Sequence, residues 1–358
     1  ITYLADLGVI PQYDTTVTIS GGQVAAQYSA WINANRDILS TANWSSYMPG
    51  TGGSEALAPL TGQDVRALMS GDYRLIEQMC RSHEHCGYWG LHYIEGNSSK
   101  FYDGASVPAI GRPLTTHSRP TLWISELNNN FNDSSTVTAD RLTVVGARAG
   151  GDWMSMDHAH QPSFGIAPFI FTGHPIYLEL TLFWASWNLF ERPPASRGPS
   201  STRGAITVDQ IRGHAWGLRN RQWVVFNLPT SDPAYTLFAS HLNDAYACYE
   251  GQRGVTTGSF NGTAMWTWGN TTGRARYGSR GMPPLKHFYE GQPQYVSTID
   301  YFPNAASQGM PPWQENFFLT VLRWGQKMGF SSSGVFAHYA QWLIGFFTSG
   351  ASPYLPGM

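Results

Sequence analysis

A recurring connector constrains the fold of this 358-residue chain more than any other feature. Four times, a short polar stretch joins two segments whose apolar residues recur at three- and four-residue spacing. Gly or a polar run ends a helix, Asp or Ser caps the next helix, and Pro is tolerated in a first helical turn. The connectors are Ser70-Gly71-Asp72, Thr172-Gly173-His174-Pro175, Thr230-Ser231-Asp232-Pro233 and residues 329–334. The sequence therefore predicts four antiparallel helical hairpins.

Long segments separate these hairpins, and a further helix is predicted over residues 22–40. Residues 95–135, 191–206 and 251–311 are rich in Gly, Asn, Thr and Pro, and loops of this length are usually functional or disordered. Their aromatic residues favour ordered loops that face a ligand. Helical hairpins that close around an axis, with long loops at one face, describe an α/α toroid. An open α-solenoid is the alternative, but its repeats would be more uniform in length.

We therefore expect a mainly α fold with three parts. An extended lead-in covers residues 1–20, the toroid domain covers residues 21–350, and residues 351–358 form a C-terminal tail that we expect to be truncated.

The composition restricts the class of partner. Charged residues make up 13% of the chain, about half of the roughly 25% that is typical of soluble domains. The net charge of −2 indicates neither a nucleic-acid nor an anionic-membrane partner. No apolar run reaches the roughly 18 residues needed to span a bilayer. A chain with 14 Trp and few charges suits a partner with flat apolar faces, such as a sugar.

The stretch "CRSHEHC", residues 80–86, raises the question of a metal. Its two cysteines could bind zinc together with the histidines between them, or they could be buried thiols or a small-loop disulfide. Zinc motifs usually pair cysteines two to four residues apart, and the chain has no second pair. We expect no metal and no other cofactor.

The stretch "DWMSMDHAHQPS", residues 152–163, is the main candidate for chemistry. It places Asp152, Asp157, His158 and His160 within nine residues, just before Gln161-Pro162-Ser163, where a helix is expected to begin. The pattern lacks the helical His-x-x-x-His spacing of hydrolytic zinc enzymes. A metal site and a purely helix-capping role are alternatives. We favour acid/base catalysis without a metal, at one mouth of the toroid.

Three segments resemble a group of uncharacterised bacterial α/α-toroid proteins related to polysaccharide lyases and glycoside hydrolases. The segments are "GDWMSMDHAHQPSFGIAPFIFTGHPIYLELTLFWASWN", "IRGHAWGLRN" and "PPWQENFFLTVLRWGQKMGF", and the resemblance spans about residues 40–348. The group has Asp-Asp where this chain has Glu315-Asn316, and Gly-Gly-Arg where it has Gly52-Gly53-Ser54. The resemblance implies the toroid fold and, by analogy, activity on carbohydrates. It also implies that a flanking β-sandwich domain could complete the cleft.

Polysaccharide β-elimination needs a group that neutralises the uronate carboxylate, a base for the proton on C5 and an acid for the leaving oxygen. His160 is the expected general acid or base, with Gln161, Arg212 and His214 as further catalytic candidates. Arg212, Trp216 and Arg219 follow one another at helical spacings of four and three, so they share one helix face. The two arginines either face the substrate or pair with carboxylates inside the barrel.

Glycoside hydrolysis instead needs two carboxylic acids at a set separation. The best pair that the sequence offers is Glu315 with Asp157 or Asp152. Glu315 is also what the dipole of a helix favours in its first turn, so a purely structural role is equally open.

Aromatic side chains could stack on sugar rings, although core packing is at least as common a role for Trp. The candidates for substrate binding, beside Trp216 and Arg219, are Trp153, Trp266, Trp268, Trp313 and Tyr301.

The predicted function is degradation of an extracellular polysaccharide, with a lyase mechanism slightly ahead of a hydrolase. The partner is then a polysaccharide or oligosaccharide, and the protein is expected outside the cell, in the periplasm or at the cell surface. A non-enzymatic surface or virion module for binding or assembly is the alternative from another class. In that case the loops at 95–135 and 251–311 would form a protein interface. A flanking β-sandwich domain or an oligomer is a further possible partner.

Overall fold

The computed structural model describes residues 1–34, 36–37, 44–45, 48, 57–124, 137–142, 156–191, 194, 197–198, 206–207, 211–253, 259–260, 263–264, 312–330 and 333–348. These residues are mainly helical, which confirms the α class. The α-helices are α1 (Thr2–Asp6), α2 (Gly21–Asn33), α3 (Gly62–Ser70), α4 (Tyr73–Glu84), α5 (Ile166–Thr172), α6 (Pro175–Phe190), α7 (Ile211–Asn227), α8 (Pro233–Arg253), α12 (Pro312–Lys327) and α13 (Ser333–Thr348). Two short 3-10 helices are η2 (His85–Tyr88) and η3 (Thr138–Asp140). Strand β1 (Arg197–Gly198) pairs antiparallel with β2 (Ile206–Thr207), and β3 (Ser259–Phe260) pairs antiparallel with β4 (Thr263–Ala264).

The four predicted hairpins are α3–α4, α5–α6, α7–α8 and α12–α13. The first and third connectors cap their second helices as expected, while residues 331 and 332 of the fourth lie outside the described residues. Gly71, with φ of 62°, ends α3 in the left-handed region that favours Gly. The Asp72 carboxylate then accepts from the Arg74 backbone N–H at 3.0 Å and caps α4. Asp232 caps α8 in the same way, accepting from the Ala234 N–H at 2.8 Å.

The second hairpin differs in its cap. Gly173 ends α5 with φ of 63°, and Pro175 opens α6. The residue between them, His174, takes the role expected of Asp or Ser. Its ring nitrogen Nδ1 accepts from the Ile176 N–H at 3.3 Å, so the imidazole satisfies one of the free amides at the start of the helix.

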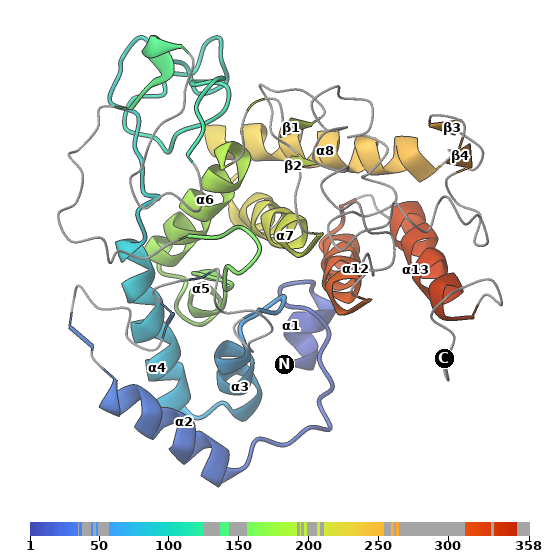
Figure 1. The fold of residues 1–358 in the computed structure, drawn as a ribbon. Coiled ribbons are helices and arrows are strands. Elements are labelled where there is room, and N and C mark those ends of the chain that lie inside the picture. Colours follow the sequence, from blue (N-terminus) through green and yellow to red (C-terminus); the bar gives the residue numbers. More distant parts are fainter. Residues whose placement is uncertain are drawn as a thin grey trace, which may run out of the picture.

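Each hairpin has one helix near the middle of the molecule and one farther out (Figure 1). Helices α3, α5, α7 and α12 lie toward the centre, and α4, α6, α8 and α13 lie outside them. Helix α7 packs on α6 and α8 and also on α12, while α13 packs on α8 and α12. Helix α4 packs on α5, so successive hairpins are neighbours, and α7 packs on three other helices.

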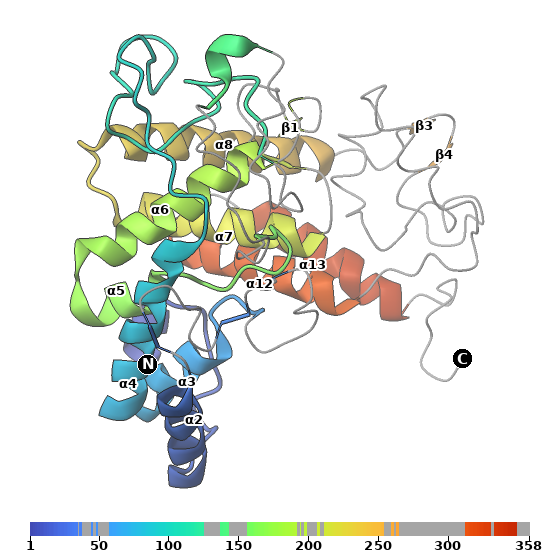
Figure 2. The same cartoon turned by 60° about the vertical axis from the view of Figure 1, so that its left-hand side comes forward.

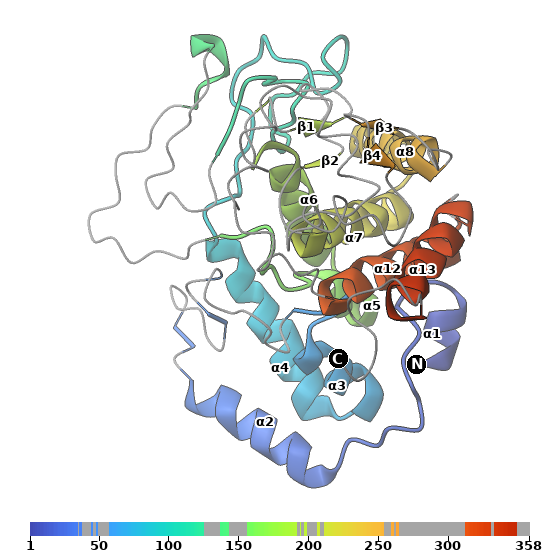
Figure 3. The ribbon, with the colours of Figure 1, turned by 45° about the vertical axis from the view of Figure 1, so that its right-hand side comes forward.

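The N-terminal segment packs against the last hairpin (Figure 3). The indole Nε1 of Trp324 in α12 donates to the Gly8 carbonyl at 2.8 Å. Ala5 and Ile10 share one buried apolar cluster with Trp324 and with Trp223 of α7. Residues of α1, α7 and α12 thus belong to the same core.

Two sequence predictions for the N-terminal region need correction. The helix expected over 22–40 is α2, which ends at Asn33 because Ala34 turns to an extended conformation. The lead-in over 1–20 is not extended throughout, since it begins with α1. The start of α2 is set by Ser20, which forms a capping box with Gln23.

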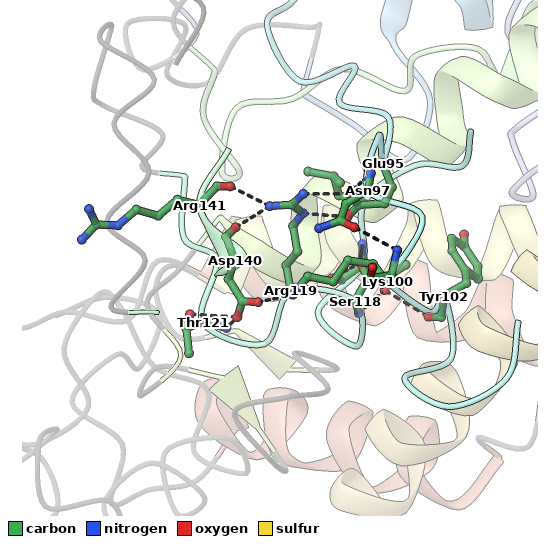
Figure 4. A network of polar contacts seen from close by, with 12 residues as sticks. Glu95, Asn97, Lys100, Tyr102, Ser118, Arg119, Thr121, Asp140 and Arg141 are labelled. Carbon is green, nitrogen blue, oxygen red and sulfur yellow. Dashed lines mark hydrogen bonds and ion pairs between the residues drawn. The ribbon is translucent and has the colours of Figure 1, made fainter. Parts of the chain in front are cut away.

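A buried polar network organises the loop segment between η2 and α5 (Figure 4). Arg119 donates to both carboxylate oxygens of Glu95, at 2.6 and 2.7 Å, and to the backbone carbonyls of Asp140 and Arg141, both at 2.8 Å. Lys100 pairs with the Asp140 carboxylate at 2.6 Å. Figures 1 and 2 place this segment at the end of the molecule that also holds α8. The ion pair of Lys100 with Asp140 and the two backbone bonds of Arg119 hold residues 137–142 against the loop.

Candidate functional site

Side chains on one face of α7 donate hydrogen bonds to the loop formed by residues 157–162. Arg212 Nη2 donates to His160 Nε2 at 2.5 Å, and Trp216 Nε1 donates to the Ala159 carbonyl at 3.2 Å. Arg219 Nη2 donates to the Pro162 carbonyl at 2.8 Å. The prediction that Arg212, Trp216 and Arg219 share a face is confirmed, and that face is turned toward the candidate site.

His160 lies between a carboxylate and a guanidinium. Its Nδ1 is hydrogen-bonded to Asp157 Oδ2, and the other carboxylate oxygen of Asp157 accepts from the Ala159 N–H at 2.7 Å. A guanidinium can only donate, so Nε2 of His160 must accept the hydrogen bond from Arg212. The proton of the neutral ring therefore sits on Nδ1 and is donated to Asp157. The arrangement runs carboxylate, imidazole, guanidinium.

Gln161 maintains the shape of the loop from within the core. It is completely buried. Its Nε2 donates to the His158 carbonyl at 3.0 Å, and its Oε1 accepts from Asn220 Nδ2 at 2.9 Å. Asn220 also donates to Asn188 Oδ1 of α6 at 3.0 Å. Gln161 is thus tied to α7 and α6, which fits a positioning role for this residue.

The helix predicted to begin at Gln161-Pro162-Ser163 begins later, and that prediction was wrong. Helix α5 starts at Ile166, because Gly165 has φ of 80° and cannot be part of a helix. The Ser163 hydroxyl accepts from the backbone N–H of Thr61 at 2.8 Å, which commits it to a loop contact. His158 and His160 consequently lie in a buried turn several residues before the helix.

A second buried histidine anchors the start of α5. The backbone N–H of Gly165 donates to His83 Nδ1 at 2.9 Å, so the ring proton is on Nε2. That nitrogen lies 3.0 Å from both carboxylate oxygens of Asp64. Both side chains are completely buried. The pair therefore fixes the residues just before α5 in the core.

His214 is not brought to His160. Its Nε2 is hydrogen-bonded to the hydroxyl of Tyr249 in α8, and its ring packs on Phe318 of α12 with centroids 5.5 Å apart. His214 follows Arg212 by two residues on α7, which turns the two side chains to different sides of the helix. The predicted group therefore divides into His160 with Arg212, and His214 with Tyr249.

Glu315 lies in the first turn of α12 and is buried. Its carboxyl group accepts from the Tyr339 hydroxyl of α13. Burial raises the pKa of Glu315 well above its usual value, which favours the protonated form of this carboxyl. Asp157 is bonded to His160 and Ala159 instead, so the two carboxyl groups proposed for hydrolysis have separate partners.

Burial also acts on the two arginines of α7. It lowers the pKa of Arg212, while the negative charge of Asp157 acts in the opposite direction. It lowers the pKa of Arg219 to about 9, against the opposing charges of Tyr13 and Asp64. Arg219 meets its donor requirement largely with backbone carbonyls, including that of Ala58 at 3.0 Å. It therefore acts as a core support of the loop.

The structure describes the side chains of only some of the substrate-binding candidates. Trp216 and Arg219 have no exposed surface, so their contact with a sugar stays a prediction that requires a rearrangement. Trp313 belongs to the first turn of α12, and its side chain lies outside the described residues. Trp153, Trp266, Trp268 and Tyr301 lie outside the described residues altogether.

Sequence reasoning missed three residues of the site. Gly213 lets α7 approach the loop, because a Cβ there would overlap the ring of His158. Its position between Arg212 and His214 was a usable signal, since Gly is unfavourable inside a helix without a packing reason. Asn220 and Tyr249 carry no comparable signal, because their partners are distant in sequence.

The thiols of Cys80 and Cys86 are both free, so the disulfide alternative is excluded for this pair. Among the residues that the structure describes, no group of three or more His, Cys, Asp or Glu side chains is arranged to hold a metal ion. None of the described helices is both long and apolar enough to cross a membrane.

No protein-family model matches the chain, and neither the curated proteins nor the solved structures compared with it include a match. The resemblance to α/α-toroid proteins therefore stays a prediction.

Proposed function

We propose that this protein is a carbohydrate-active enzyme that cleaves an extracellular polysaccharide by β-elimination. In this proposal the inner and outer helices are parts of an α/α toroid. The observation that carries the proposal is the line formed by Asp157, His160 and Arg212. It combines an oriented base with a fixed positive charge, and elimination from a uronate needs both.

The roles follow from the hydrogen bonds. Asp157 keeps the ring proton of His160 on Nδ1, which makes Nε2 the basic nitrogen. In the reaction, Nε2 takes the proton from C5 of the uronate, and the electron pair of that C–H bond forms the C4–C5 double bond. The C4–O bond breaks, and the leaving oxygen receives a proton from the imidazolium. Arg212 pairs with the uronate carboxylate and stabilises the charge that develops there.

The accessibility of the side chains agrees with this division of roles. His160 keeps 7% of its surface exposed and Arg212 keeps 4%, whereas Gln161 has none. Asp157 keeps 5%, so all three residues of the line retain some exposed surface. Gln161 then positions the loop and does not touch the substrate.

The direct test is incubation with a panel of uronic-acid and neutral polysaccharides. Ultraviolet absorbance of the unsaturated product and the appearance of reducing ends are followed together. A joint rise in both signals is expected for uronic-acid polymers only. Reducing ends without absorbance would replace elimination by hydrolysis.

The matched test of the base is His160→Gln. We expect a fall in kcat of about 10²- to 10⁴-fold, which is the usual contribution of a general base. His174→Gln is the control, because His174 is an exposed helix cap whose ring contacts Ile176 and Tyr177 of its own helix. A His160→Gln protein that folds and retains the full rate would remove His160 from the mechanism.

A protein interface is the second candidate function, and one observation favours it. Ile94, Phe101 and Ile110 expose 55%, 40% and 52% of their surfaces. All three belong to the loop that the bridges Ile94–Pro113 and Phe101–Pro108 hold together. Exposed apolar side chains that gather on one segment mark interaction surfaces. A folded protein that is silent in both assays but forms a defined oligomer would support this function.

A further inference from the structure

We propose that Arg212 blocks His160 in the free protein, and that the carboxylate of a uronic acid releases the histidine by taking over the guanidinium. This inference rests on the proposed function and adds to it the requirement for an anionic substrate. Arg212 is then a positioning residue that acts through His160, as well as the group that binds the carboxylate.

The first step of the argument is that both nitrogens of His160 are occupied. Nδ1 donates to Asp157, and Nε2 accepts from Arg212 Nη2 at 2.5 Å. A neutral imidazole has one basic lone pair, which here is on Nε2. While the guanidinium donates to that lone pair, Nε2 cannot accept a proton from carbon.

The second step is that a carboxylate competes well for the guanidinium. Two N–H groups of an arginine can bond both oxygens of a carboxylate, and such charge-assisted pairs are about twice as strong as neutral hydrogen bonds. An imidazole offers one neutral acceptor. Arg212 is also buried, where the attraction between opposite charges is weakened less by water.

The third step concerns the competing carboxylate that is already present. The Asp157 side chain is held by the Ala159 N–H and by Nδ1 of His160. The imidazole lies between it and the guanidinium, so Asp157 attracts Arg212 without occupying it directly. An incoming carboxylate therefore leaves the contact between Asp157 and His160 intact. A neutral sugar carries no group that could displace Arg212 in this way.

The test observes the histidine itself and needs no turnover. Protein labelled with nitrogen-15 in histidine is titrated with glucuronate and, as the neutral match, with glucose. The His160 signals are assigned by their loss in His160→Gln. Glucuronate is expected to change the nitrogen-15 chemical shift of His160 Nε2 and to leave that of Nδ1 nearly unchanged. Glucose is expected to change neither chemical shift. Sulfate is added separately, and a response equal to that of glucuronate would show that the site accepts anions without selecting a carboxylate.

Two variants sharpen the result. In Arg212→Met without ligand, the chemical shift of His160 Nε2 should already be close to the value that the wild type reaches with glucuronate. The affinity for glucuronate should fall by about tenfold or more, because a hydrogen-bonded charge is lost. Arg323→Met removes an exposed arginine of α12 and should respond like the wild type. The titration of the wild type stands even if Arg212→Met does not fold.

The inference is overturned if glucuronate leaves the chemical shift of His160 Nε2 unchanged, or if glucose changes it by the same amount. Its failure is separable from failure of the proposed function. A shift of Nε2 without polymer cleavage would keep the anion site and remove the lyase. Cleavage without a shift would keep the lyase and remove the block by Arg212.

Discussion

At the scale of single residues, the behaviour of the site depends on which atom donates each hydrogen bond. Arg212 can only donate, and this single fact assigns the tautomer of His160 and the direction of its bond to Asp157. The same reasoning gives His83 the opposite tautomer, because a backbone N–H occupies its Nδ1. Two buried histidines of one chain thus present different nitrogens to their carboxylate partners.

Glu315 gives the residue-scale prediction. Its pKa is raised by burial, so the folded protein holds this proton more tightly than the unfolded chain does. The stabilising effect of protonation is fully present below the unfolded pKa and is lost as the pH rises through the folded pKa. Over that interval the free energy of unfolding should fall with pH by up to about 1.4 kcal/mol per unit.

Glu315→Gln should remove this slope and keep the acceptor oxygen for Tyr339. Urea unfolding of both proteins between mildly acidic and alkaline pH measures the difference. Parallel pH profiles would show that Glu315 is ionised in the folded state. Activity adds a second readout, since the substitution should abolish cleavage only if the hydrolase alternative holds.

At the scale of elements, α7 is the template on which the site loop is built. It supplies donors to the side chain of His160 and to the backbone of Ala159 and Pro162. The helix can do so because Gly213 allows the His158 ring to lie directly against its backbone.

Two glycines of α7 give a matched pair for a prediction. Gly213→Ala should lower the free energy of unfolding by about 1 to 3 kcal/mol, because the new methyl group overlaps the ring of His158. Gly217→Ala should raise it by up to about 1 kcal/mol, since Ala is the better helix former and the nearest atom, of Asn188, lies at an ordinary 3.6 Å. Chemical denaturation of both variants checks the opposite signs. Equal effects would mean that the contact of Gly213 with His158 does not set the position of the loop.

At the scale of the whole molecule, the contact between the N-terminal segment and α12 joins the first described helix to the last hairpin. Trp324 donates to the carbonyl of Gly8, and Gly8 itself lies against the backbone of Lys327. Ala5 of α1 and Trp324 of α12 also belong to one buried cluster. Stability at the ends is therefore coupled to the core that α7 shares.

Gly8→Ala should open this contact. Gly8 has φ of 75° and Gly71 has φ of 62°, so Ala at either position costs about 1 to 2 kcal/mol of backbone strain. Only Gly8 has a neighbour in the way, because a Cβ there would lie 2.8 Å from the Lys327 carbonyl oxygen, whereas Gly71 faces open space. Gly8→Ala should thus destabilise more than Gly71→Ala and speed proteolysis within residues 1–12. Equal denaturation midpoints and equal cleavage rates would show that the contact does not hold the ends together.

Local signals in the sequence determined the elements of this protein. Apolar spacing, glycines at helix ends and capping side chains act over a few residues, so the four hairpins and the shared face of Arg212, Trp216 and Arg219 could be predicted. The start of α5 was missed because its position depends on Gly165 and on Ser163 bonding to Thr61, which lies 102 residues away. The partner of His214, Tyr249, was missed for the same reason.

What only the tertiary structure decided is which polar groups meet and in what protonation state. The sequence offers five candidates and does not show which of them meet: Asp157, His160, Arg212, His214 and Glu315. Packing of α7 against the loop connects the first three by hydrogen bonds. His214 is hydrogen-bonded to α8 instead, and Glu315 to α13. Burial then raised the pKa of Glu315, because desolvation depends on everything that surrounds a group. Helix and turn propensities depend on neighbouring residues in the sequence, whereas electrostatic environments form only after distant segments have packed together.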